Sequence, residues 1–206
     1  MLSLKILLRA LRAGELKTIF ISLCLSVAVV AAVSIFAERI EKAIVNESKE
    51  LLGSDFIVKS SKPIPQVWIE YAVNRNIDVS RTLSFASVVF FNEDMHLANI
   101  KAVQSNYPLR GRILTSQLPF TYDVKQMEEF TSGPKVGEIW VESRLLPILN
   151  VEIGSQIDIG ESSLTITKIL IEEPEGPSFS ILGSRILMNF ADVESTNVVQ
   201  PGSRVT

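Results

Sequence analysis

The residues of this sequence that are best suited to chemistry lie around its single histidine, His96, which follows the turn Asn92-Glu93-Asp94. A histidine beside a carboxylate can activate a serine for nucleophilic attack, so a hydrolase is one hypothesis. The sequence lacks the Gly-x-Ser-x-Gly turn that presents a nucleophilic serine. It also lacks a pair of acidic residues in apolar surroundings that could transfer protons. The pattern therefore favours a solvated histidine on a hairpin, and we expect no catalytic residue.

Residues that would bind an ion or a cofactor are also sparse. The oxygens of the same turn could hold a hard cation, but they lack the spacing of a calcium loop. Glu172, Glu173 and Glu175 surround Pro174 and are typical of a solvated acidic loop. No Gly-x-x-x-x-Gly-Lys-Ser/Thr loop occurs, so the chain is not expected to hydrolyse ATP itself. The sequence predicts no enzyme, no metal site and no cofactor site.

The elements that position these residues begin with an uncharged stretch of twenty residues, Thr18 to Ala37. A helix of this length spans roughly 30 Å, the thickness of the hydrocarbon core of a bilayer. Eleven of its residues are Ile, Leu, Val or Phe, which favour insertion. We expect a transmembrane helix over residues 17–37. The alternative is a cleaved secretory signal with Ala32-Val33-Ser34 as the cleavage site, but the apolar run is longer than in a typical signal.

The basic residues before and at the start of this stretch predict its orientation. Against the single acid Glu15 they give residues 1–17 a side-chain charge of +3, and since the whole chain carries −3, residues 18–206 carry −6. Positive charge before a first span keeps the N-terminus in the cytoplasm. We expect a protein of the inner (plasma) membrane whose main domain is periplasmic or extracytoplasmic. The membrane-interface basic residues are Lys5, Arg9, Arg12 and Lys17.

Residues 1–16 form a leader on the cytoplasmic side. Four leucines (Leu4, Leu7, Leu8 and Leu11) share one helical face, and the basic side chains lie toward the other. This pattern favours an amphipathic helix at the membrane surface whose basic side chains reach lipid phosphates. The alternative is a plain cytoplasmic extension of the span.

Composition excludes two further classes. The only cysteine, Cys24, lies inside the apolar stretch, so no intrachain disulfide can form. A net charge of −3 leaves no electrostatic footprint for nucleic acid. The roughly 170 residues beyond the span must therefore fold by packing alone, and they are numerous enough to build a hydrophobic core.

Small and hydroxyl side chains form a ridge along the apolar stretch. Thr18, Ser22, Ser26 and Ser34 recur at multiples of four residues, which places them on one side of a helix. In lipid, such side chains permit close helix approach and offer hydrogen bonds between helices. We expect this ridge to pack against other membrane helices. The alternative is that each hydroxyl bonds the backbone of its own helix.

The rest of the chain predicts a stalk and an α+β domain. Residues 38–54 continue the helical pattern to Gly53 and form the stalk. The domain, residues 55–206, opens with a strand at 55–60 and a helix whose stripe of Ile64, Val67, Trp68, Tyr71 and Ala72 we expect in the core. Strands over 79–91 and 96–103 complete a β-α-β-β core.

The remaining domain residues predict a smaller β-rich part. Residues 112–134 are less regular and indicate an excursion, whereas strands are expected at 137–141, 156–159, 164–171 and 185–190 with a short helix at 142–149. The sequence ends with a Pro201-Gly202 turn and a strand-like segment, and no polar tail follows them. We expect the domain to be truncated at its C-terminus.

Several of these segments resemble a known family. Residues 137–170, GEIWVESRLLPILNVEIGSQIDIGESSLTITKIL, are similar to the extracytoplasmic domains of FtsX-like, MacB-type permeases of ABC transporters. The leader with LRAGELK, the single span and the stalk agree with that family. Tyr107-Pro108-Leu109-Arg110-Gly111, Ile186-Leu187-Met188-Asn189 and Gln200-Pro201-Gly202-Ser203-Arg204 resemble its YbbP-type branch. Where the family has Leu-Gly, this chain has Leu149-Asn150, and Asn also tolerates a left-handed backbone.

The resemblance implies a function that the residues alone do not. It implies the N-terminal part of a permease subunit, with a first transmembrane helix and a first MacB-type periplasmic domain. Its partners would be a separate cytoplasmic ABC ATPase that binds the ATP, further transmembrane helices of the permease, membrane lipids and a periplasmic partner. ATP-driven motion of the periplasmic domain would serve extraction of lipids or hydrophobic compounds, efflux or mechanotransmission. The alternative is a single-span, membrane-anchored binding or sensor module.

Overall fold

A computed structural model of the chain describes residues 15–121, 123–174 and 183–200. The leader with Lys5, Arg9 and Arg12, together with Glu175 and the segment from Pro201 onward, lies outside the described residues. The chain divides into two compact units, Met1–Glu47 and Ser48–Thr206, and each is described by itself. The helices are α2 (Glu15–Leu52), α3 (Gln66–Val73), α4 (Leu145–Leu149) and α5 (Val193–Thr196), with short 3-10 turns η1 (Val124–Gln126) and η2 (Phe190–Asp192). The strands are β1 (Thr82–Phe91), β2 (Asp94–Val103), β3 (Ile113–Ser116), β4 (Met127–Phe130), β5 (Glu138–Glu142), β6 (Gln156–Ile159), β7 (Ser162–Glu172) and β8 (Ser184–Asn189).

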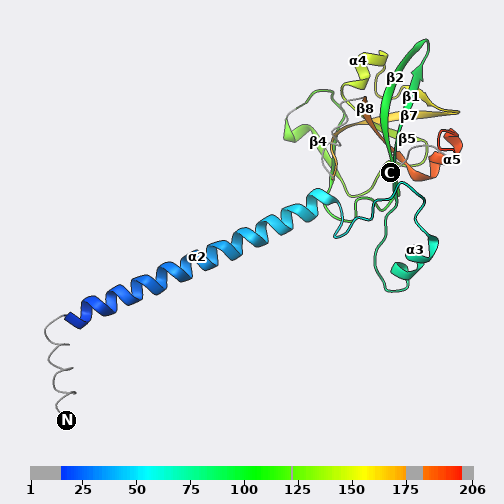
Figure 1. Cartoon of the computed structure of the whole chain (residues 1–206). Helices are drawn as coiled ribbons and strands as arrows, with labels where there is room; N and C mark the ends of the chain where they lie inside the picture. Colours follow the sequence, from blue (N-terminus) through cyan, green and yellow to red (C-terminus); the bar gives the residue numbers. More distant parts are fainter. Residues whose placement is uncertain (1–14, 122, 175–182, 201–206) are drawn as a thin grey trace, which may run out of the picture. The chain divides into compact units, whose positions relative to one another are not determined.

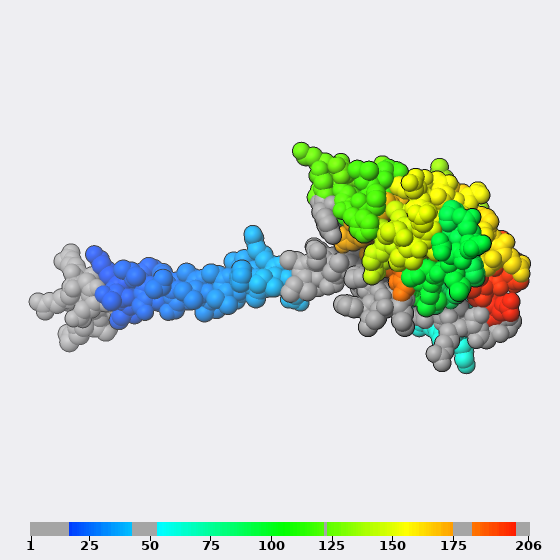
Figure 2. Space-filling model, turned by 90° about the horizontal axis from the view of Figure 1, so that it is seen from above, coloured from blue at the N-terminus to red at the C-terminus, as the bar shows by residue number. Residues whose placement is uncertain are grey.

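Helix α2 is one continuous helix of 38 residues (Figure 1). Its segment Lys17–Lys42 has a mean hydropathy of 2.7 and is long and apolar enough to cross a membrane. None of this segment is buried inside the protein, and its large apolar side chains are all exposed. Figure 2 shows the blue surface of α2 with no other described part of the chain covering it on the visible side. Exposed apolar surface of this extent requires an apolar surrounding, which a bilayer supplies.

The domain is built on one mixed sheet of eight strands, so the predicted α+β class is confirmed. The strand order is β4-β3-β7-β5-β8-β2-β1-β6, and β6 also pairs with β7. Because β6 pairs with both β1 and β7, six strands close into a ring: β7, β5, β8, β2, β1 and β6. Strands β3 and β4 extend from β7 beside the ring.

The main core is built from side chains of all six ring strands. Strand alternation explains it, because every second side chain points to the same face. On β2, for example, Ala98, Ile100 and Ala102 are buried in this core. Helix α4 adds Leu145 and Leu149, and it ends at Asn150 in the left-handed conformation with a φ of 52°. The left-handed backbone that we attributed to Asn150 is thus observed.

A second, smaller core lies on the other face of the same strands. It consists of Val103, Tyr107, Ile113, Trp140, Leu170 and Leu187, with Phe130 packed against it. Phe130 and Trp140 stack at a tilt with ring centroids 5.2 Å apart. Since Ile113 lies on β3 and Phe130 on β4, the excursion expected at 112–134 and the predicted small subdomain are part of the same sheet.

The strand expected at residues 55–60 does not form, so the predicted β-α-β-β core lacks its first strand. Phe56 and Val58 alternate as they would in a strand, yet they are 91% and 61% exposed. A strand is stable only when its backbone pairs with a neighbour. The alternating sequence is compatible with an extended backbone, but it does not show whether a neighbouring strand is available for pairing.

Helix α3 also departs from the prediction. Its apolar stripe was expected in the core, but the helix contains no buried residue. Figure 1 shows α3 beside the sheet, covering neither face. The helical period of Ile64, Val67, Trp68 and Tyr71 is real, and it faces outward with Trp68 60% exposed.

Candidate functional site

The ridge predicted for helix packing lies on the exposed surface of α2. Thr18, Ser22, Ser26 and Ser34 are all exposed, as is the basic residue Lys17. Ser26 Oγ donates a hydrogen bond of 2.8 Å to the carbonyl oxygen of Ser22, four residues earlier. A hydroxyl bonded in this way still has lone pairs available for a neighbouring helix. Packing of the ridge against other membrane helices stays a prediction.

The segment that follows α2 is fastened to the domain at a junction, which we define as Gly53, Asp55, Tyr107, Pro108, Arg110 and Pro174. Gly53 directly follows the last residue of α2, is buried, and has a φ of +65°. This left-handed backbone is usual just past the end of a helix, and glycine adopts it without strain. A Cβ placed on Gly53 would lie 2.8 Å from Cβ of Pro174 and 3.6 Å from Cβ of Pro108.

Arg110 holds the same segment from the other side. Its backbone N–H donates to the carbonyl oxygen of Gly53 at 2.9 Å. Its guanidinium donates to Asp55 Oδ2 at 3.2 Å through Nη2. The ion pair is exposed and contributes little, whereas the backbone bond fixes the position of Gly53. Arg110 belongs to the Tyr107–Gly111 motif, which sequence reasoning had used only for the resemblance.

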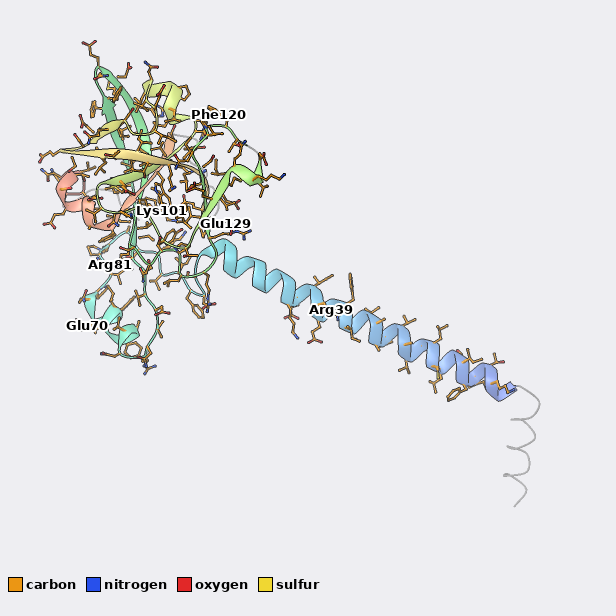
Figure 3. All side chains as sticks on the ribbon, turned by 180° about the vertical axis from the view of Figure 1, so that it is seen from behind. Arg39, Glu70, Arg81, Lys101, Phe120 and Glu129 are labelled. Carbon is orange, nitrogen blue, oxygen red and sulfur yellow. The ribbon has the colours of Figure 1, made fainter. Side chains whose placement is uncertain are left out.

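Tyr107 connects the junction to the sheet. Its side chain is buried in the second core, and a cis peptide bond joins it to Pro108. The hydroxyl donates to the carbonyl oxygen of Pro174 at 3.1 Å and accepts from Lys101 Nζ at 2.7 Å. Lys101 lies on β2, inside the domain (Figure 3). The end of α2 is thus linked through Pro174 and Tyr107 to a central strand.

From Lys101 a row of alternating charges, the charged row, crosses three neighbouring strands. Lys101 Nζ lies 3.4 Å from Glu173, and Arg185 on β8 lies 3.8 Å from Glu173. Arg185 also lies 3.8 Å from Glu142 on β5, and Arg144 lies 3.0 Å from the same carboxylate. All but Arg144 are largely buried. Removing one member of a buried ion pair leaves its partner buried without compensation, which is strongly destabilising. The charged row therefore holds β2, β8 and β5 together.

Glu142 carries the clearest electrostatic signature of the row. Burial would raise the pKa of its carboxyl group, but hydrogen bonds from the Arg144 side chain and the Arg185 backbone outweigh that effect. The positive charges of Arg185 and Arg144 act in the same direction, so the pKa of Glu142 lies below its ordinary value of 4.5. Its charged form is therefore stabilised by folding.

This shift predicts how domain stability changes in acid. A lowered folded pKa adds stability that is complete above the ordinary pKa and is lost as the pH falls through the folded pKa. We expect Glu142→Gln to lower the free energy of unfolding at pH 7 by about 1 to 3 kcal/mol and to flatten its loss below pH 5. Thermal unfolding of the detergent-solubilised chain between pH 3 and 7 measures this.

Glu129 offers a matched control for that prediction. Its ion pair with Arg112 is more than half exposed on both sides, so Glu129→Gln should leave stability and its pH dependence nearly unchanged. Equal pH profiles for Glu142→Gln and the unaltered chain would contradict the assignment of the shift to the charged row.

His96, the sequence candidate for catalysis, is half-buried on β2. Its Nε2 lies 3.4 Å from Oγ of Ser184, at the start of β8. Ser184 is buried, with only 3% of its surface exposed. Among the residues that the structure describes, no group of three or more His, Cys, Asp or Glu is placed to hold a metal ion. The geometry at His96 is that of a packing contact between strands.

Comparison with known proteins bears on the resemblance inferred from the sequence. The chain matches no protein-family model. It is 35% identical over 199 residues to the uncharacterized ABC transporter permease YbbP of Escherichia coli strain K12. The YbbP-type resemblance is confirmed. The match covers 96% of this chain but 23% of YbbP, so the chain spans about a quarter of the length of that relative.

The YbbP match and the structure together support two statements. The chain is related to a permease of an ABC transporter, and it carries a helix long and apolar enough to cross a membrane. The residues of the junction were not predicted as a site. The one signal that pointed to them was the Tyr107–Gly111 motif, whose partners Gly53 and Pro174 are more than fifty residues away in sequence.

Proposed function

We propose that this chain is part of the membrane permease subunit of an ABC transporter. In this proposal a separate cytoplasmic subunit hydrolyses ATP, and the permease converts that hydrolysis into motion of an extracytoplasmic domain. The observation that carries the proposal is the 35% identity to the permease YbbP over nearly the whole chain. The motion would serve extraction of lipids or hydrophobic compounds, efflux or mechanotransmission.

The junction gives this proposal a physical route. Displacement of α2 along its length would act on Gly53, whose backbone is held by Arg110 and which has no room for a Cβ beside Pro174. Tyr107 and Lys101 then lead to β2, and the charged row leads on to β8 and β5. Packed elements of this kind move as units because protein interiors are dense and only slightly compressible.

The same proposal assigns partners and orientation. The ATP is bound by the partner ATPase, and this chain supplies transport and no catalysis. Residues 1–16 would lie in the cytoplasm because positive charge flanks the span on that side. Further transmembrane helices would pack on the ridge of α2, lipids would surround its other faces, and a periplasmic partner would meet the domain. Nucleic acid is not among the expected partners.

Co-purification tests the partner. The chain, tagged at its N-terminus, is expressed in its native host and purified from detergent-solubilised membranes. We expect recovery of an ATP-binding-cassette subunit in stoichiometric amount. Recovery of a stable, folded chain without any ATPase would contradict the proposal and favour a single-span binding or sensor module.

The ridge on α2 provides a second prediction. Replacing Ser22 and Ser26 together with leucine should weaken assembly, because the larger side chains prevent close helix approach and remove two hydroxyls. At roughly 0.6 kcal/mol for each lost interhelical hydrogen bond, plus the lost packing, we expect a several-fold lower yield of the complex. The yield of ATPase per tagged chain measures this.

Ala31→Leu is the matched control for the ridge. Ala31 is nine residues from Ser22, which places it on the opposite side of the helix, and the substitution adds similar bulk. We expect this variant to assemble normally. Unchanged assembly and transport of Ser22→Leu with Ser26→Leu would refute the packing role of the ridge.

A further inference from the structure

The segment of residues 56–77 places apolar side chains outward on one side of the domain. On α3 the outward side is formed by Val67, Trp68 and Tyr71, and the exposed Ile64 lies two residues before the helix. The other exposed apolar residues of the segment are Phe56, Val58, Val73 and Ile77. Exposed apolar side chains gathered in one segment are typical of an interaction site.

A different side of α3 faces the domain, so the outward side is not part of the core. Ile69 and Ala72, on the inward side, are the half-buried residues of α3. The segment after α3 is fixed to the loop that follows β2. Arg81 N–H donates to Gln104 Oε1 at 2.9 Å, and Asn106 Nδ2 donates to the carbonyl oxygen of Val79 at 2.9 Å. In Figure 3, Arg81 and Glu70 mark this connection and the helix beyond it.

The chemistry of the segment is that of a membrane-water interface. Trp and Tyr favour this interface because their rings are apolar and their N–H and O–H groups remain hydrated. Arg75 lies over the Tyr71 ring at 4.2 Å, so a cation sits beside the aromatic side chain. Residues 56–81 contain Lys59, Lys62, Arg75 and Arg81 against Glu70 and Asp78, a balance of +2, whereas residues 18–206 as a whole carry −6. Local positive charge on an acidic chain is complementary to lipid phosphates.

The covalent connection keeps this segment within reach of a bilayer. Helix α2 continues for ten residues past Lys42, the end of its apolar segment, which is roughly 15 Å of helix. The thirteen residues from Gly53 to Pro65 separate α2 from α3 and can span at most roughly 45 Å. These two lengths place an upper limit of roughly 60 Å on the distance between the end of the apolar segment and α3.

From these observations we infer that residues 56–77 dock on the lipid headgroup region of the membrane that α2 crosses. Ile64, Val67, Trp68 and Tyr71 enter the interface, and Lys59, Lys62 and Arg75 contact phosphates. This contact gives the domain a second attachment to the bilayer besides α2. It goes beyond the permease proposal and does not depend on an ATPase.

The two tryptophans of the chain provide a direct test, because Trp68 is exposed and Trp140 is buried in the second core. The full chain is reconstituted in vesicles of phosphatidylcholine and phosphatidylglycerol, freed of loosely bound protein by carbonate, with or without brominated acyl chains. Bromine quenches a tryptophan only when the ring lies among the lipids. We expect bromolipid to remove up to roughly half of the total emission, the share of one tryptophan in two.

Three variants make the result specific. Trp68→Phe should remove the quenching, since only Trp140 then emits. Val67→Ser with Tyr71→Ser should reduce the quenching severalfold by removing apolar contacts of the outward side. Val73→Ser is the matched control, because it removes an exposed apolar side chain from the same helix but from a different side.

Acrylamide, a quencher in the water phase, separates the remaining outcomes. Trp68 that is quenched by acrylamide and unaffected by bromolipid lies in water, and the inference is then wrong. Trp68 that is shielded from both quenchers, with shielding that grows with the ratio of protein to lipid, contacts a second protein copy, and this result also overturns lipid docking. Loss of the ATPase partner in co-purification would leave all of these readings unchanged.

Discussion

Alanine in place of Gly160 is expected to destabilise the domain by about 2 to 4 kcal/mol, a large part of the total stability of a typical domain. Gly160 lies in the turn between β6 and β7 with a φ of +59°, where a side chain is strained. Its Cβ would lie 2.0 Å from the carbonyl oxygen of Thr196 and 2.5 Å from Cγ2 of Val198. The oxygen is backbone and also accepts the N–H of Glu161 at 2.9 Å, so it cannot move without cost.

The effect of Gly160→Ala is measured by thermal and urea unfolding of the detergent-solubilised chain. Gly154→Ala is its matched control, because Gly154 has a φ of +95° but no atom within 4 Å of the added Cβ. We expect the control to lose only the conformational term, about 1 to 2 kcal/mol. Equal losses for the two variants would show that the contact with Thr196 is relaxed in the protein.

The second large effect is expected at the junction. Gly53→Val should weaken the docking of the segment after α2 by about 1 to 3 kcal/mol, because Cβ would meet Pro174 at 2.8 Å and the left-handed backbone disfavours a branched side chain. If the chain is part of a permease as proposed and the junction carries motion from α2 to the sheet, ATP hydrolysis by the proposed ATPase partner should no longer drive transport. We expect the helix, the membrane insertion and the ATPase complex to persist.

Gly137→Ala controls for a glycine substitution elsewhere in the domain. Gly137 has a φ of +82° and no atom within 4 Å of an added Cβ, and it is far from the junction in sequence. Transport driven by ATP, compared with complex yield for each variant, separates coupling from assembly. A Gly53→Val variant that assembles and transports like the unaltered chain would refute a mechanical role for the junction.

Sequence periodicity predicted most of the domain because it reports local geometry. In β1, which lies within the strand expected at 79–91, Phe85 and Val89 are buried and their sequence neighbours are exposed. Periodicity alone does not show which apolar faces pack against another helix or strand. Trp68 follows the same helical rule as any core residue, yet nothing in its spacing shows that α3 buries no residue.

The junction could not be predicted for a different reason. Gly53 was expected only as the end of a helix, and Tyr107 and Arg110 only as part of a motif. Their common role depends on contacts between residues 53, 110 and 174, which no pattern along the chain encodes. The pairing of the charged row is likewise a product of strand order, since Glu142, Arg185 and Lys101 lie on β5, β8 and β2.

The position of β8 in the sheet has a consequence for biosynthesis. Strand β8 lies between β5 and β2, and it pairs in parallel with β2 from more than eighty residues earlier in the chain. Such non-local pairings close late because the loop entropy is lost before the contact is gained. A ribosome adds about 5 to 20 residues per second, so β2 and β5 stay unpaired at facing edges for several seconds after β2 is made. The nascent domain therefore exposes two open strand edges until residue 189 has been made, and open edges of this kind promote aggregation.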